Sequence, residues 1–175
     1  MKKHTKASME VIIATEPNAT PPPQDDNSLV VSLNGLIQVC REAHDGYMKA
    51  ADGITSSAYK TMFAEYAHQR SRFASQLANL VVEYGGDAED DGQAMKLFSH
   101  GWIGIEPAVM GGDYGAIFAE CESSEAIARE AYERVLEKSL SEDVAPIVNR
   151  QYEQIVEAHN RIHNLLEAYE LEHKN

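Results

Sequence analysis

Four long stretches of this chain repeat apolar residues at the three- and four-residue spacing of an α-helix. They cover roughly residues 28–53, 55–84, 113–135 and 143–169. The sequence nowhere sustains the two-residue alternation of a half-buried strand, so it predicts an all-α protein. Short connections separate the first stretch from the second and the third from the fourth, which makes the helices of each pair antiparallel neighbours. The expected architecture is two helical hairpins joined by one long connection.

The long connection should carry a helix of its own. We expect a shorter helix from about Gln93 to a glycine pair just before Asp113, which is a favourable N-cap for the next helix. Pro107 lies inside this segment, and proline removes a backbone donor and disturbs the preceding turn. We therefore expect a kink or break near Glu106. The predicted fold class is all-α, a bundle of four long helices with an additional shorter helix in the crossover.

The N-terminal segment has a different composition from the rest of the chain. It contains three consecutive prolines and shows no sustained apolar period. We expect residues 1–27 to form a disordered tail and residues 28–172 to form the bundle.

Net charge and cysteine usage limit the partners and the compartment. The formal net charge of −13 argues against nucleic acid or an anionic membrane, because both are polyanions. No apolar run approaches the ~20 residues of a membrane span or the ~7–15 residues of a signal-peptide core. Cys40 and Cys121 fall on apolar stripes without CxxC spacing, which indicates buried free thiols in a reducing compartment. We expect a cytoplasmic protein.

Each apolar stripe is interrupted near its middle by polar residues. The interruptions are His44, Gln69 with Arg70, Glu120 and His159. Counted from the helix ends at a rise of ~1.5 Å per residue, with the second hairpin reached by a crossover along the bundle, their heights differ by roughly one helical turn. A buried polar group costs free energy unless it is paired or binds something. The sequence therefore predicts either a metal site or a self-satisfied polar network in the middle of the bundle.

The metal hypothesis rests on His44, Glu120 and His159. Two imidazoles and a carboxylate can hold one divalent ion, and these ligand types suit iron or manganese.

The rival hypothesis is a polar network. Arg70 should point into the same layer, where a buried Arg–Glu pair needs no metal and would disfavour a cation beside it. In this hypothesis the network residues are Gln69, Arg70, Tyr66 and Gln151, with Glu120 as the acidic partner.

The ligand set of a di-iron bundle is incomplete in this sequence. Such sites use a Glu-x-x-His motif on each of two helices, and the last apolar stretch, residues 143–169, contains none. The motif Glu65-x-x-His68 points away from its helix's apolar stripe, so we expect both side chains to face solvent. We also expect a group of acidic residues on outward faces to be solvated: Glu42, Glu122, Glu125, Glu130 and Glu133.

Short motifs between about Asn27 and Tyr169 match one known family. They are Gly46-Tyr47 with Ala50-Ala51, Gln69-Arg70-x-x-Phe73-Ala74-x-x-Leu77, Gly85-Gly86, His100-x-Trp102, Gly111-Gly112-Asp113, Glu120-Cys121-Glu122-x-x-Glu125 and His159. On these residues the chain resembles a bacterial ferritin-like four-helix-bundle family of unknown function. The resemblance implies the fold and no activity, because none is assigned to that family. The chain departs from the family pattern at Pro107, and at Ala43 where the family tends to have glycine.

The leading hypothesis is a non-catalytic bacterial ferritin-like protein with a buried polar network and a stress-associated or interaction-mediating role. No nucleophile–base pair, phosphate loop or zinc spacing favours an enzyme. Two alternatives stay open: an iron- or manganese-binding bundle with a ferroxidase-type or storage role, and a bundle that binds a small ligand in an interior lined by tyrosine and histidine. A homodimer formed through helix faces is compatible with each.

Overall fold

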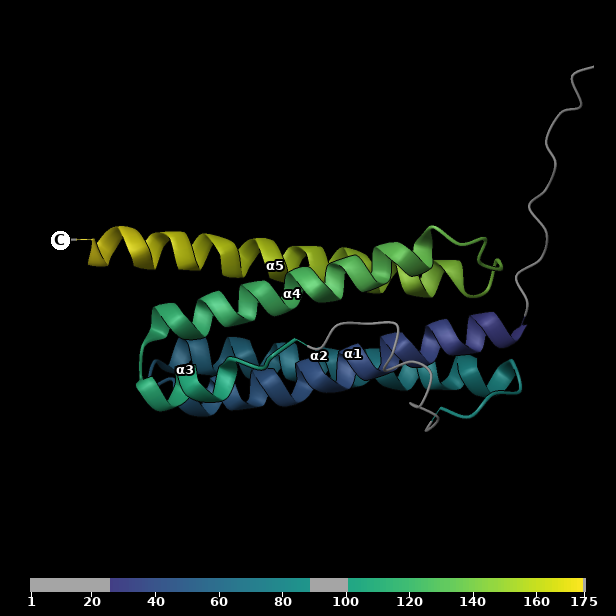
Figure 1. The fold of residues 1–175 in the computed structure, drawn as a ribbon, viewed down its shortest axis with the longest axis horizontal. Helices are drawn as coiled ribbons and strands as arrows, with labels where there is room; N and C mark the ends of the chain where they lie inside the picture. The colour runs from purple at the N-terminus through teal and green to yellow at the C-terminus, as the bar shows by residue number, and fades with distance from the viewer. Residues whose placement is uncertain (1–25, 89–100, 175) are drawn as a thin grey trace, which may run out of the picture.

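A computed structural model describes residues 26–88 and 101–174 of the chain, and this part contains five helices and no strand (Figure 1). The helices are α1 (Asp26–Gly53), α2 (Ser57–Glu83), α3 (Ile105–Gly111), α4 (Tyr114–Leu136) and α5 (Ala145–His173). The all-α class predicted from the apolar periods is confirmed for the described residues. The expected tail, residues 1–27, falls mostly outside them, and α1 includes its last two positions.

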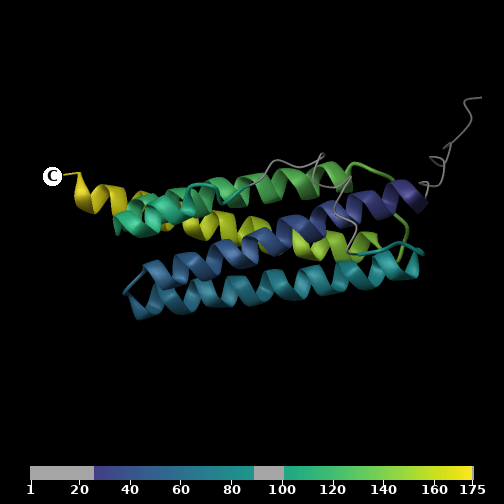
Figure 2. The same ribbon diagram turned by 60° about the horizontal axis from the view of Figure 1, so that its bottom comes forward.

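The four long helices form two hairpins that lie on each other as two layers (Figures 1 and 2). The first layer is α1 with α2, and the second is α4 with α5. In Figure 1, α2 and α4 run in one direction along the long axis, whereas α1 and α5 run in the other. The chain leaves α2 at one end of the molecule and enters α3 and α4 at the opposite end. Between the layers, α1 packs closely against α4, whereas α2 has less contact with α5.

Helix α3 differs from the expected crossover helix. It begins at Ile105, so Pro107 lies in its first turn, where a missing backbone N–H removes no helical hydrogen bond. Proline therefore causes no break within α3. Residues 89–100, which include the expected start at Gln93, lie outside the described residues.

The core consists of two apolar clusters, one toward each end of the layered helices. The stripe that α1 buries has a strict spacing of three and four residues: Leu29, Leu33, Leu36, Cys40, Ala43, Tyr47 and Ala50. Glycine permits the left-handed turns that end the second and third helices, with φ of 72° at Gly85 and 66° at Gly112. Asp113 caps α4 as predicted, because its carboxylate accepts a hydrogen bond from the Gly115 N–H.

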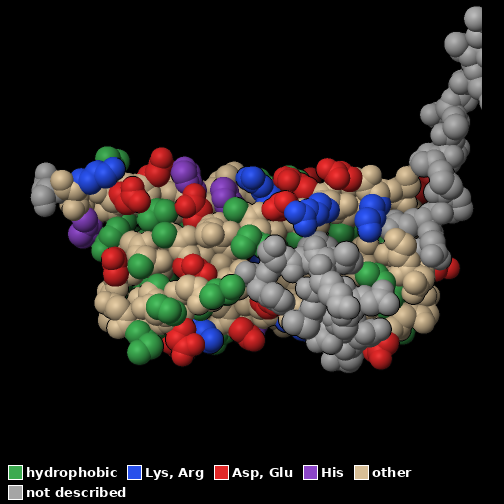
Figure 3. Space-filling model, in the orientation of Figure 1, with side chains coloured by type: hydrophobic (Ala, Val, Ile, Leu, Met, Phe, Trp, Pro, Cys, Tyr) green, Lys and Arg blue, Asp and Glu red, His purple; other side chains and the backbone are tan. Residues whose placement is uncertain are grey.

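The surface is predominantly acidic, as the net charge requires. Acidic side chains are spread over both layers on the face shown in Figure 3, and histidines appear at the surface along α5. Each helix in the described ranges is too short or too polar to cross a membrane.

Candidate functional site: a polar network between the two layers

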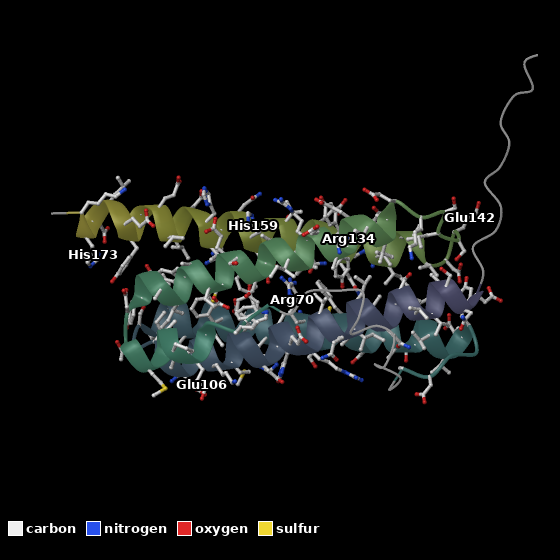
Figure 4. The ribbon with its side chains drawn as sticks, viewed as in Figure 1. Arg70, Glu106, Arg134, Glu142, His159 and His173 are labelled. Carbon is white, nitrogen blue, oxygen red and sulfur yellow. The ribbon has the colours of Figure 1, made fainter. Side chains whose placement is uncertain are left out.

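A buried ion pair connects the two layers at the middle of the molecule. Arg70 of α2 and Glu125 of α4 have side-chain exposures of 1% and 0%. The Nη2 atom of Arg70 donates hydrogen bonds of 2.7 Å to both carboxylate oxygens of Glu125. The hydroxyl of Tyr47, on α1, donates a third bond of 2.6 Å to Glu125 Oε1. Three helices thus meet at one carboxylate, and Figure 4 shows Arg70 between the two layers.

Electrostatics in this layer keep Arg70 charged and Tyr47 neutral. Burial, the largest single influence, would lower the pKa of the Arg70 guanidinium. The charge and hydrogen bonds of Glu125, together with smaller contributions from Tyr47 and Cys40, outweigh it, and the pKa is raised. Burial, together with the Glu125 charge, raises the pKa of Tyr47 well above its ordinary value. Tyr47 therefore stays a hydrogen-bond donor, and Glu125 is held by partners from the protein itself.

Two glutamines extend this layer to the fourth long helix. Arg70 Nη1 donates to Gln69 Oε1 at 2.7 Å, and Gln69 Nε2 donates to Gln154 Oε1 of α5 at 3.0 Å. We call Tyr47, Glu125, Arg70, Gln69 and Gln154 the charged layer. It joins α1, α2, α4 and α5 in one chain of hydrogen bonds.

A second, neutral layer lies one heptad along the bundle. The Cys40 Sγ and Tyr132 Oη atoms are 3.2 Å apart, and Tyr132 donates to Gln151 Oε1 at 2.7 Å. Gln151 Nε2 then donates to Gln76 Oε1 at 2.9 Å. We call these residues, Cys40, Tyr132, Gln151 and Gln76, the neutral layer. Cys40 precedes Tyr47 by seven residues and Tyr132 follows Glu125 by seven, so both layers use the same faces of α1 and α4.

The titrating groups of the neutral layer are protonated at neutral pH. Burial raises the pKa of the Cys40 thiol to about 11, and burial raises the pKa of Tyr132 well above its ordinary value. A nucleophilic cysteine needs a lowered pKa, because the thiolate is the reactive form. Cys40 is therefore a packed hydrogen-bonding group rather than an activated nucleophile.

The predicted network residues all lie near these layers. Gln69 and Arg70 belong to the charged layer and Gln151 to the neutral layer. Tyr66 is half-buried, with its ring centroid 5.3 Å from that of Tyr47, and burial raises its pKa. The acidic partner differs from the expected one, because it is Glu125 and not Glu120.

The predicted metal ligands do not come together. His44 is partly exposed and its Nδ1 lies 2.9 Å from Asp45 Oδ1. Glu120 is partly buried and accepts a hydrogen bond of 2.9 Å from the Gly104 N–H. His159 is partly exposed on α5. Within residues 26–88 and 101–174, no group of three His, Cys, Asp or Glu side chains is placed to hold a metal ion.

Small residues explain why the two histidines lie at the edge of the buried stripes. Ala43 and Ala158 are each 1% exposed and occupy the core-facing positions next to His44 and His159. Alanine adds little apolar signal to a sequence pattern, yet it fits where helices approach closely. A histidine one position further along is rotated by about 100° toward the rim of the stripe.

The burial of Glu125 is a correction, because the sequence predicted this side chain on a solvated face. Glutamate is almost never fully buried unless it is paired, so its position alone favoured solvent. The signal for burial was the spacing of Phe118, Glu125 and Tyr132, which are seven residues apart and are all fully buried. The other acids of that group are not buried, and Glu65 and His68 are both exposed, as predicted.

A match to one protein family includes most of the residues of the charged and neutral layers. Residues 28–138 match a family model described as Domain of unknown function (DUF2383). The chain belongs to this family. The matched region contains α1 from residue 28 onward and all of α2, α3 and α4, whereas α5 lies beyond it. It includes Cys40, Tyr47, Arg70, Glu125 and Tyr132. No curated protein matches the chain.

Proposed function

We propose that this member of the DUF2383 family is a non-catalytic, ferritin-like four-helix-bundle protein whose two polar layers select one pairing and register of the helices. In this role the bundle is a rigid acidic scaffold for interaction with other molecules, consistent with a stress-associated bacterial protein of the cytoplasm. The observation that carries the proposal is the Arg70–Glu125 pair, whose carboxylate is held by the guanidinium and Tyr47.

The course of the chain supports the ferritin-like assignment. Ferritin-like bundles consist of two antiparallel hairpins joined by one long crossover. Here α2 ends at one end of the molecule and α4 begins at the opposite end, so that α2 and α4 are parallel (Figure 1). Every neighbouring pair of long helices is then antiparallel.

The energetics of buried charge support a role in specificity. A buried ion pair often contributes less to stability than apolar residues of the same volume would, and its best-attested use is to fix register and partner choice. Shifting one helix by a single residue would leave Glu125 or Arg70 without its partner. The charged layer therefore penalises alternative packings more strongly than an apolar core does.

A double substitution tests the register hypothesis. Arg70→Met and Glu125→Leu, made together, replace the pair by apolar side chains of similar size. We expect stability near that of the original chain, or above it, with heterogeneous packing visible as multiple or broadened amide resonances. A double variant with a single sharp set of resonances would contradict a role in register.

Metal analysis tests the alternative function. An iron- or manganese-binding bundle using His44, Glu120 and His159 would require these side chains to move together. We expect protein purified without chelator to contain no stoichiometric metal, and chelator to leave the thermal midpoint unchanged. Stoichiometric iron or manganese that is lost in Glu120→Gln would overturn the non-catalytic proposal and favour the storage or ferroxidase-type role.

A further inference from the structure

The backbone at Trp102, just before α3, has an unusual conformation. Its φ of 68° makes it the one non-glycine residue with positive φ among the described residues. The left-handed region is disfavoured for a bulky side chain, and such outliers persist only where surrounding contacts hold them. We call residues 101–104, which contain Trp102, the strap.

Two hydrogen bonds to α4 hold the strap in place. The Trp102 N–H donates to Ser124 Oγ at 2.8 Å, and the Gly104 N–H donates to Glu120 Oε1 at 2.9 Å. Ser124 and Glu120 are one helical turn apart on the same face of α4. This hydrogen bond is the local role of Glu120, which was expected in the buried layer.

The strap places the indole ring in a slot on α1. The ring lies against Gly46, where a Cβ atom would overlap the indole carbons. Its centroid is 4.6 Å from that of Tyr47 in an edge-on arrangement. Tyr47 also contacts Phe63, with centroids 5.8 Å apart, and it donates to Glu125. The partly exposed indole thus covers the aromatic side of the charged layer.

We propose that the Trp102 indole is a releasable plug of the slot over Gly46. When the strap moves away from α4 and the indole leaves, the slot binds a small planar aromatic molecule. The strained backbone favours release, whereas aromatic contact and two hydrogen bonds oppose it. A ligand in the slot would replace the indole against Tyr47. A ligand that carries an N–H or O–H group could also bond to the Ser124 hydroxyl, which release of the strap frees.

A substitution that removes the indole tests whether the slot binds an added aromatic molecule. In Trp102→Gly, glycine accepts the positive φ, so the strap keeps its path while the ring is removed. Because Trp102 is the single tryptophan of the chain, added indole is then the only indole fluorophore. We expect saturable 1:1 binding with a blue shift of indole emission and a raised thermal midpoint. Adding Gly46→Ala to this variant, which fills the slot with a Cβ, should abolish the binding.

Release of the plug is tested in the protein that retains Trp102. Ser124→Ala removes the acceptor for the Trp102 N–H, so acrylamide should quench Trp102 fluorescence more strongly than in the original chain. The matched control is Ser123→Ala, at the exposed neighbouring position, which should not change quenching. Phenol, with excitation where only tryptophan absorbs, should shift Trp102 emission to longer wavelength in a saturable way, and Gly46→Ala should remove this response.

Two results would overturn the proposal. One is the absence of saturable indole binding by a folded Trp102→Gly variant, or binding that persists after Gly46→Ala. The other is a Trp102 emission that phenol leaves unchanged, together with equal quenching in Ser124→Ala and Ser123→Ala. If Trp102→Gly does not fold, the second set of measurements decides alone.

Discussion

At the scale of single residues, the stability of the fold depends on the partners of each buried polar group. Glu125 has three hydrogen bonds and a fully buried side chain, whereas Glu130, five residues later on the same helix, is exposed beside Arg134. Removing one member of a buried pair leaves the other charge uncompensated. Removing one member of an exposed pair leaves the other charge solvated by water, so little stability is lost.

Glu125→Ala should therefore destabilise the fold strongly, by about 3–5 kcal/mol, because it leaves the charged Arg70 guanidinium buried without its partner. Glu130→Ala is the matched control, and its effect should stay within about 0.5 kcal/mol. Denaturant melts of both variants measure the free energies of unfolding. Similar stabilities for the two would mean that the charged layer is hydrated in solution.

Cys40 should react very slowly with thiol reagents in the folded protein. Its side chain is fully buried and burial raises its pKa to about 11, so at neutral pH almost no thiolate is present. Alkylation followed by mass spectrometry, with and without denaturant, measures the rate at this site. Rapid modification of Cys40 without denaturant would show that the neutral layer opens readily.

At the scale of helices, an exposed contact between α4 and α5 should respond to pH. His163 Nδ1 lies 2.6 Å from Glu122 Oε1, and its Nε2 lies 3.5 Å from Glu167 Oε1 on the same helix. The hydrogen bond to Glu122 is the main cause that raises the pKa of His163 above its ordinary value of 6.5. The folded protein therefore binds this proton more tightly than the unfolded chain does.

The contribution of His163 to stability should be complete below pH 6.5 and should be lost as pH rises through the raised pKa of the folded state. Thermal midpoints measured across this range should fall less with rising pH in His163→Gln than in the original chain. His68→Gln, at an exposed position of α2, is the control and should keep the original profile. Because His163 is exposed, the effect should weaken as salt is added.

At the scale of the whole molecule, the described helices contain two apolar core clusters. The buried stripe of α1 begins at Leu29, and the described residues of both core clusters lie from Leu29 onward. From its composition, we expect the N-terminal segment to bury too little apolar surface to offset the entropy of ordering.

Deleting residues 1–25 should leave the thermal midpoint nearly unchanged. Deleting residues 1–33 instead removes Leu29 and Leu33, which are 3% and 0% exposed, and should lower it clearly. Calorimetry of the two truncated chains makes the comparison. A large drop for the shorter deletion would show that the N-terminal segment packs on the helices.

The candidate site was only partly predictable from the sequence. Arg70, Gln69 and Gln151 were identified because polar residues on an apolar stripe need partners, and the structure gives each of them one. Glu125 was missed because a glutamate between other glutamates resembles a solvated face. Its pairing became visible only when the tertiary structure brought the side chains of Arg70 and Glu125 together across the core.

The sequence by itself determined the four long helices, since periodic apolar residues and glycine turns act locally along the chain. It also determined that polar groups enter the interior. The tertiary structure decided which ones, because burial depends on how closely two helices approach. Ala43 and Ala158 permit close approach and displace His44 and His159 to the rim. One residue position, which is a rotation of about 100° about the helix axis, decides whether a side chain faces the core or its rim. Local sequence hardly specifies this rotation. It therefore could not tell a metal site from a hydrogen-bonded ion pair.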